Sequence, residues 1–223
     1  MKSFKKLIAG FLCLSIILLC GCTTDKKGTK KFHGYEFPAA VYDGISVEDC
    51  YLYSGEYVED ASFESCENVV ALKVKNTSLV DIQLIRLKVT TDAKEMMFEI
   101  STLLAGETVV VLEKSKQTIE EKEKILSIDY ENRIFFDRDI SLKEDVFMLQ
   151  VNQKTINIKN ISQTEIESDI YVYYKKKDAD GNYFGGITFR TKAEGLKPDE
   201  IKQLPAANFD PDNSEVLFVD YAK

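Results

Sequence analysis

Val70-Ala-Leu-Lys-Val-Lys-Asn-Thr-Ser78 decides the fold, because a shorter form of it returns later in the chain as Ile156-Asn-Ile-Lys-Asn-Ile-Ser162. In both stretches apolar residues alternate with other residues, which is the period of two of a half-buried β-strand. In both, the alternation ends at an asparagine that is followed two residues later by a serine, and short polar side chains favour turns. The sequence therefore predicts two copies of a strand that ends in the same turn.

The repeat continues beyond these strands. Leu103-Leu-Ala-Gly-Glu107 is matched by Leu196-Lys-Pro-Asp-Glu200, and Ile125-Leu-Ser-Ile-Asp-Tyr130 is matched by Val216-Leu-Phe-Val-Asp-Tyr221. The three pairs occur in the same order in both halves, which chance similarity between generic strands would not readily produce. We therefore expect two related units, joined within residues 132–145.

The two units differ in length at one place. Asn76 and Glu107 are 31 positions apart, whereas Asn160 and Glu200 are 40 positions apart. The additional residues fall around 175–186, where a longer hairpin would accommodate them.

Short strands follow one another along both units. Apart from the repeat, strands are predicted at Ile82–Thr90, Thr108–Glu113, Ile170–Lys175, Ile187–Thr191 and Val216–Tyr221. The only segment with helical character is the short, charged Thr118–Lys124. Strands at this spacing, in units of roughly 95 residues, are typical of small sandwiches. The sequence predicts an all-β fold of two tandem Ig-like antiparallel β-sandwich domains, at residues 35–131 and 132–223.

The N-terminus carries an export signal. Three lysines precede the uncharged stretch Leu7–Leu19, which is too short for a membrane-spanning helix of about 20 residues but suits a signal peptide. The stretch ends in Leu19-Cys20-Gly21-Cys22, which resembles the lipobox of bacterial lipoproteins. An uncleaved anchor and an ordinary secretion signal are the alternatives.

The resemblance to a lipobox implies a cellular location. In bacterial lipoproteins the last cysteine of the motif is acylated, with palmitate among other chains, and becomes the first residue of the mature protein. Residues 1–21 would then be the signal peptide, Cys22 the lipidation site, and residues 22–34 a flexible tether. The body would lie on the extracytoplasmic face of the cell membrane, held there by its N-terminal lipid.

The charge of the chain excludes one class of partner. The formal net charge is −8, and removal of the signal peptide takes away three lysines and no acidic residue. An acidic surface argues against nucleic acid, which needs clustered Lys and Arg.

The cysteines and the histidine limit the chemistry. Cys50 and Cys66 are the only cysteines of the exported body, and they form either a disulfide that closes a loop of about fifteen residues or two separate buried thiols. His33 is the only histidine and lies in the predicted tether, so neither a zinc site nor a Ser-His-Asp or Cys-His centre is expected. We expect no enzymatic activity and no cofactor.

Asp178-Ala-Asp180-Gly181-Asn182 offers oxygen atoms at alternate positions around a glycine, as calcium loops do. The favoured interpretation is a hairpin tip, since Asp-Gly and Gly-Asn are typical turn sequences. Gly185-Gly186 nearby indicates a bulge or a close approach of backbones.

Aromatic residues concentrate around the same hairpin. Tyr171 and Tyr173 lie at alternate positions and share one face of a strand, and Tyr183 and Phe184 follow on the next strand. Exposed tyrosines suit carbohydrate or protein contact, so these four residues are a candidate binding surface. Ordinary cross-strand pairing is the alternative.

A family resemblance rests on the order of these motifs. A strand that ends in Asn-x-Ser, a second alternating strand, a Leu/Gly-Glu turn and a further strand resemble the FxLYD-type and related Ig-like domains of bacterial surface lipoproteins. The phrase Phe-x-Leu-Tyr-Asp itself is absent. We expect a non-catalytic interaction or structural module whose partner is an envelope protein or a glycan. A ligand- or calcium-binding accessory lipoprotein is the alternative.

Overall fold

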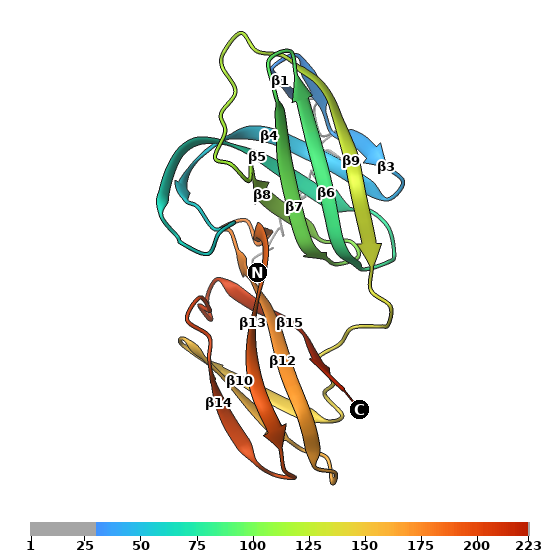
Figure 1. The fold of residues 1–223 in the computed structure, drawn as a ribbon, viewed down its shortest axis with the longest axis vertical. Helices are drawn as coiled ribbons and strands as arrows, with labels where there is room; N and C mark the ends of the chain where they lie inside the picture. Colours follow the sequence, from blue (N-terminus) through green and yellow to red (C-terminus); the bar gives the residue numbers. More distant parts are fainter. Residues whose placement is uncertain (1–29, 223) are drawn as a thin grey trace, which may run out of the picture.

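The structure, a computed structural model, describes residues 30–222, and every regular element in this range is a β-strand (Figure 1). The predicted all-β class is confirmed. The helix predicted at Thr118–Lys124 is wrong, because the segment is an irregular loop held against the neighbouring strand. Ile119 is buried in the core, and the Glu123 carboxylate accepts hydrogen bonds from the Thr91 hydroxyl and the Glu120 N–H.

The first half of the chain forms a sandwich of two sheets, here called the N-terminal sandwich. One sheet has the order β8-β5-β4-β3 and the other has the order β7-β6-β9. The strands are β3 (Ala39–Tyr42), β4 (Ile45–Glu56), β5 (Ser65–Asn76), β6 (Ile82–Thr91), β7 (Glu95–Leu103), β8 (Thr108–Leu112) and β9 (Ile125–Phe135). A small hairpin, β1 (Lys30–Phe32) and β2 (Tyr35–Phe37), precedes them.

The second half forms the C-terminal sandwich, in which a sheet of order β10-β11-β14 faces a sheet of order β13-β12-β15. The strands are β10 (Phe147–Asn152), β11 (Thr155–Asn160), β12 (Ile166–Lys177), β13 (Tyr183–Leu196), β14 (Ile201–Pro205) and β15 (Ser214–Tyr221). The two halves have matching topologies. Strands β4, β5 and β8 correspond to β10, β11 and β14 and form one sheet of each sandwich. Strands β6, β7 and β9 correspond to β12, β13 and β15 and form the other sheet. This is the arrangement of an Ig-like sandwich, in which strands cross between the sheets.

The predicted turn occurs in both halves with the same hydrogen bonds. Asn76 and Asn160 are fully buried. The side-chain amide of Asn76 donates to the carbonyls of Val80 and Leu103. In the same way, the amide of Asn160 donates to the carbonyls of Thr164 and Leu196. The oxygen of each amide accepts from the N–H and the hydroxyl of the serine two residues later. The asparagine therefore joins the end of one strand to the end of a strand in the opposite sheet.

The two sandwiches share one sheet. The far ends of β12 and β13 extend out of the C-terminal sandwich, and β13 pairs in parallel with β8 through Tyr183–Val109 and Phe184–Val110 (Figure 1). The resulting seven-stranded sheet runs in the order β15-β12-β13-β8-β5-β4-β3. The additional residues around 175–186 were predicted to form a longer hairpin. The ends of β12 and β13 form this hairpin, so the prediction is confirmed. The division into separate domains at residues 131 and 132 stays a prediction.

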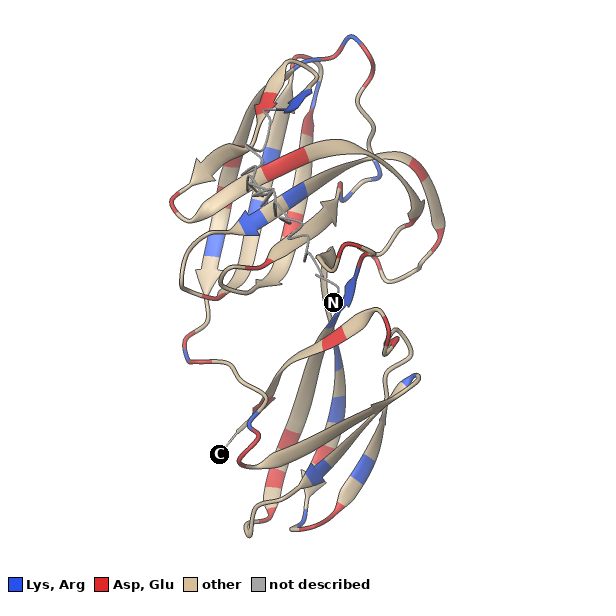
Figure 2. Ribbon diagram, turned by 180° about the vertical axis from the view of Figure 1, so that it is seen from behind, with Lys and Arg blue, Asp and Glu red and all other residues tan. Residues whose placement is uncertain are grey.

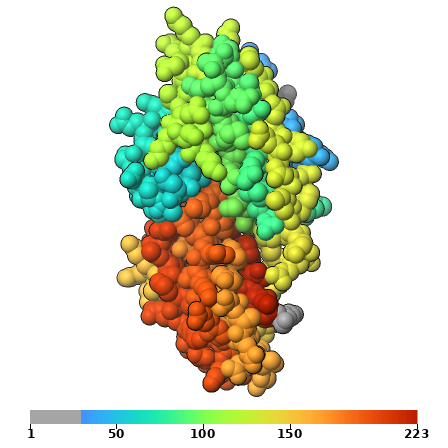
Figure 3. All heavy atoms as spheres, viewed as in Figure 1, coloured from blue at the N-terminus to red at the C-terminus, as the bar shows by residue number. Residues whose placement is uncertain are grey.

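Each sandwich has its own apolar core, and a third cluster lies where they meet. Val70, Leu72 and Val74 point into the core of the N-terminal sandwich, as their alternation predicts. Ala71, on the opposite face of β5, is buried as well, because Tyr57 and Phe184 cover that face. Figure 3 shows the two halves in contact at the waist of the molecule.

The predicted tether extends too far into the fold. Residues 30–34 are part of the folded structure: Lys30–Phe32 pair with Tyr35–Phe37, and the carbonyl of His33 accepts a hydrogen bond from Ile125. Phe32 packs against the core, which holds this hairpin on the N-terminal sandwich. Residues 1–29, with Cys22, lie outside the described residues.

Candidate functional site

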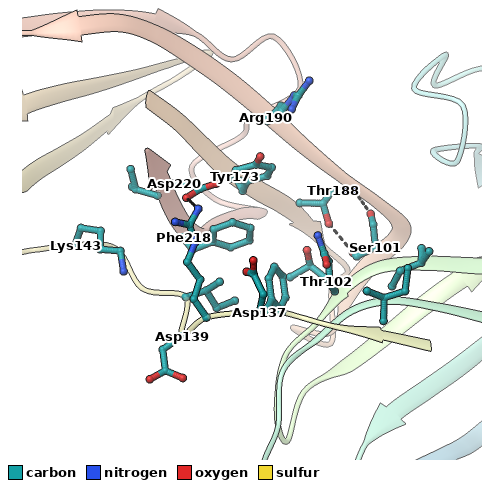
Figure 4. A pocket seen from close by; sticks show the side chains of 17 residues that line it. Ser101, Thr102, Asp137, Asp139, Lys143, Tyr173, Thr188, Arg190, Phe218 and Asp220 are labelled. Atoms are coloured by element: carbon teal, nitrogen blue, oxygen red, sulfur yellow. Dashed lines mark hydrogen bonds and ion pairs between the residues drawn. The ribbon is translucent and has the colours of Figure 1, made fainter. Parts of the chain in front are cut away.

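A cleft of about 520 Å³ lies between the two sandwiches (Figure 4). Its walls come from three places: the ends of β6 and β7, the connection after β9, and the outward face of β12, β13 and β15. Ligand pockets commonly form at such junctions and commonly have volumes of about 300–1,000 Å³.

The cleft has an aromatic wall. Along β12, Val172 and Tyr174 point into the core of the C-terminal sandwich, so Tyr171 and Tyr173 lie on the opposite face, as predicted. The Tyr173 ring stacks on Phe218 with centroids 4.3 Å apart, and Phe136 meets Phe218 edge-on at 5.5 Å. These rings come from β12, β15 and the connection, so the wall exists only in the folded chain.

Charged side chains of both signs surround this wall. Arg138 forms an ion pair with Asp220, and the Arg190 guanidinium lies over the Tyr171 ring at 4.9 Å from the centroid. Asp137 and Lys143 also line the cleft, and within residues 30–222 neither side chain has a hydrogen-bonding or ionic partner. The cleft can therefore offer both donors and acceptors to a ligand.

Hydrogen bonds between β7 and β13 close one end of the cleft. The Ser101 hydroxyl accepts from the N–H of Thr188 at 2.8 Å and donates to the carbonyl of Gly186 at 3.0 Å. The Thr188 hydroxyl donates to the carbonyl of Ser101 at 2.6 Å (Figure 4). These bonds fix the two walls of the cleft relative to each other.

A buried lysine supports the same junction. Lys175 is fully buried, and its ammonium group donates to the carbonyls of Gly185, Gly186 and Ile187, each at 3.0 Å. It fills the irregularity between β12 and β13, where the pairing shifts register after Tyr174. Three carbonyls that point into the protein thereby receive a donor.

Glu59 holds the junction from the other side. Its carboxylate accepts hydrogen bonds from the N–H groups of Gly186, at 2.8 Å, and Leu112, at 2.8 Å. Gly186 thus bonds Glu59 through its N–H and Lys175 through its carbonyl. Burial raises the pKa of Glu59 and lowers the pKa of Lys175 to about 7, and in each case the opposite charge nearby works against the shift.

The glycine pair is a close approach of backbones, as the sequence predicted. A Cβ atom on Gly186 would lie 1.9 Å from the carbonyl oxygen of Glu99, and one on Gly185 would lie 2.5 Å from a methyl group of Val58. Gly185 also has φ +88°, a conformation that side chains disfavour. Only glycine lets β13 lie this close to the N-terminal sandwich.

The predicted aromatic surface is divided by the fold. Tyr171 and Tyr173 are half-buried on the cleft side, whereas Tyr183 is 3% exposed and packs in the core of the N-terminal sandwich. Phe184 packs against Tyr53 with ring centroids 5.3 Å apart. Tyr183 is therefore not a surface residue, because the β8–β13 pairing carries it into the core.

The segment with Asp178, Asp180 and Asn182 forms the tip of the β12–β13 hairpin. The Asp178 carboxylate accepts from the N–H groups of Asp180 and Asn182 and from the Asn182 side-chain amide. Its oxygens are thus used within the turn, which is the favoured interpretation from the sequence. No cluster of three or more His, Cys, Asp or Glu side chains suited to a metal occurs in the described part of the chain.

Cys50 and Cys66 are both free and buried, so of the two alternatives the structure has separate thiols. Cys66 lies opposite Gly55 in the β4–β5 ladder, five residues from Cys50, which is a distance of about 16 Å along a strand. A disulfide requires Cα atoms within about 7 Å. The two thiols also belong to different apolar clusters.

No family model, curated protein or solved structure matches the chain. Within residues 30–222 there is also no helix that could cross a bilayer. The resemblance to lipoprotein Ig-like domains therefore stays an expectation.

Most residues of the junction carry no signal in the sequence. Lys175 and Glu59 are two charged residues among many, and no motif joins them. Ser101 and Arg190 become neighbours of the cleft only through the packing of the two halves. The one signal was Gly185-Gly186, which marks where β13 meets the N-terminal sandwich.

Proposed function

We propose that the chain is a lipid-anchored, extracytoplasmic and non-catalytic binding module, and that its partner at the cell envelope contacts the cleft between the sandwiches. The proposed lipid anchor and extracytoplasmic location rest on the lipobox-like motif at Leu19–Cys22. The binding role rests on one observation: the cleft has charged and aromatic groups on walls that hydrogen bonds hold in place.

The rigidity of the junction supports binding more than a role as a flexible spacer. A flexible spacer needs only a linker between its domains. Here the side chains of Ser101, Glu59 and Lys175 all form hydrogen bonds with the backbone of Gly186, where the two halves meet. A preorganised site loses less conformational entropy when it binds. Figure 2 shows acidic and basic residues interspersed over both halves, so recognition by one strongly charged face is not favoured.

The anchor can be tested in a bacterial host that processes lipoproteins. The full chain is expected in the membrane fraction and to incorporate a palmitate analogue, and Cys22→Ser is expected to abolish the labelling. Equal labelling of the variant would overturn the lipid anchor.

The binding role can be tested by capture of partners from solubilised envelopes with the full chain. Arg190→Gln removes a cation of the cleft, and Gly186→Ala disturbs the junction through contact with the Glu99 backbone. A partner that is retained by the wild type and by the control Arg86→Gln, and lost with both cleft variants, supports the proposal. Partners that are captured equally by all four proteins contradict it.

A further inference from the structure

We propose that the cleft binds the end of an uncharged glycan chain, a ligand class that rests on the binding role proposed above. Four properties of the cleft carry this inference: its charge balance, its hydrogen-bonding groups, its aromatic row and one strained residue.

The charges of the cleft balance one another. Arg138 is neutralised by Asp220. The remaining charged residues of the lining are Lys143 and Arg190, against Asp137 and Asp139. A phosphate or carboxylate ligand would call for an excess of cations, as Arg clusters provide elsewhere. Two cations and two carboxylates instead favour a ligand without net charge.

The polar groups suit vicinal hydroxyls. Asp137 offers two acceptor oxygens, Arg190 offers a fork of donors, and Gln83 offers both through one amide. Within the described residues none of these three side chains donates to or accepts from another protein group, although Arg190 contacts the Tyr171 ring. A sugar hydroxyl both donates and accepts, so adjacent hydroxyls can satisfy such a mixed set.

An aromatic row leads out of the cleft along β12. Tyr173 lines the cleft, and Tyr171, the next residue on the same face, lies with its ring centroid 6.5 Å from that of Tyr173. Aromatic rings give apolar area together with a polar handle, which matches the C–H face and hydroxyl rim of a sugar ring. A chain whose end occupies the cleft could continue over Tyr171.

Thr102 is strained where it lines the cleft. Its φ is 61°, although branched side chains strongly disfavour this region, and it is 4% exposed. The corresponding position before Leu196 is Gly195, with φ 59°. Strained residues tend to occur at ligand sites. Within the described residues the Thr102 hydroxyl has no hydrogen-bond partner, and Thr102 belongs to the lining of the cleft.

The test titrates the full chain in detergent with neutral tetrasaccharides: β1,4-linked N-acetylglucosamine, β1,4-linked glucose and α1,4-linked glucose. A tetragalacturonate and an alanine tetrapeptide serve as the anionic and peptide comparators. Calorimetry is expected to detect at least one neutral saccharide. Arg190→Gln and Asp137→Asn, both at exposed positions, should each weaken this binding about tenfold or more. The control Arg86→Gln should leave it unchanged.

The alternative outcomes are decisive. Binding of only the tetragalacturonate, or of none of the saccharides, overturns the glycan inference. So does saccharide binding that Arg190→Gln and Asp137→Asn leave intact. Binding of only the peptide also overturns it, but leaves the cleft as a protein-binding site and the proposed function standing. The proposed function is refuted separately, by an envelope experiment in which no captured partner is lost with Arg190→Gln and Gly186→Ala.

Discussion

The turn at Asn76 and the turn at Asn160 have the same hydrogen bonds, whereas the two hairpins that follow them differ. In the N-terminal sandwich Thr91 and Lys94 close a tight connection between β6 and β7. In the C-terminal sandwich β12 and β13 extend to a tip at residues 178–182. The repeated turn holds each sandwich together, and the unequal hairpin joins one sandwich to the other.

The turn and the hairpin are under two different kinds of constraint. The turn is needed in each half because a buried amide connects both sheets. The hairpin extension is needed once, since a single strand can pair with β8. Mutations can therefore be directed at what the halves share or at what distinguishes them.

The largest effect is expected for Lys175→Met. The variant removes three hydrogen bonds to backbone carbonyls, of which only that of Gly186 keeps a side-chain donor, the Ser101 hydroxyl. It also leaves Glu59 without the nearby charge of Lys175. Each buried acceptor that loses its donor costs about 1–3 kcal/mol, so the loss of three such bonds should lower the free energy of unfolding by more than about 3 kcal/mol. Urea unfolding of the full chain measures this loss. Lys192→Met, an exposed lysine on the same hairpin, should change the free energy of unfolding by no more than about 0.5 kcal/mol. Equal effects of the two variants would show that the junction does not depend on Lys175.

The shared turns should come next. Asn76→Ala and Asn160→Ala each remove two donated and two accepted hydrogen bonds at a fully buried position. We expect each to lower the free energy of unfolding by about 3 kcal/mol, because buried carbonyls lose their donors. Hydrogen exchange should show the loss of protection first in the mutated half. If only one variant is destabilised, the two turns are not equivalent.

The pH dependence of Lys175 gives a smaller effect. Its pKa in the folded chain is about 7, below its ordinary value of 10.5, because burial disfavours the ammonium form. Between these values the unfolded chain holds the proton and the folded chain does not. This lysine therefore makes the free energy of unfolding rise with pH, by at most about 1.4 kcal/mol per pH unit.

The measurement compares wild type with Lys175→Met between pH 7 and 9.5. The difference between the two unfolding free energies is expected to grow as the pH rises. Parallel profiles would contradict the lowered pKa.

The smallest effect concerns the left-handed positions, where the halves differ in residue type but not in conformation. Thr102 and Gly106 have positive φ in the first half, as Gly195 and Asp199 have in the second. Gly195→Thr should destabilise the chain by about 1–2 kcal/mol. Thr102→Gly should change stability by less than about 1 kcal/mol, since relief of strain and added chain entropy oppose each other. Thermal unfolding measures both, and a stabilising Gly195→Thr would show that the two positions are not comparable.

Much of each sandwich could be predicted from local pattern. Val70, Leu72 and Val74 alternate, and Asn76 ends their strand, because a strand with one buried face imposes a period of two. The same signal was present but missed in β7, where Met96, Phe98 and Ile100 are buried at alternate positions. The helix predicted at Thr118–Lys124 fails because tertiary contacts of Ile119 and Glu123 override a weak local preference.

The cleft could be predicted only in part. Tyr171 and Tyr173 share a face as their spacing requires, but nothing local indicates that Phe218, Arg190 and Ser101 surround them. Tyr183 belongs to the same aromatic group in the sequence, yet it is buried because its strand pairs with β8. Pairing between distant strands depends on the whole fold, and local patterns do not specify it.

The sequence by itself determined the strands, their repeat and the turns that end them, because hydrophobic alternation and the hydrogen bonding of short polar side chains act over a few neighbouring residues. Only the tertiary structure decided that the longer hairpin crosses to the other sandwich, that Lys175 and Glu59 meet across Gly186, and that a cleft forms beside them. These features depend on contacts between residues far apart in the chain, whose energy exists only once both sandwiches have formed.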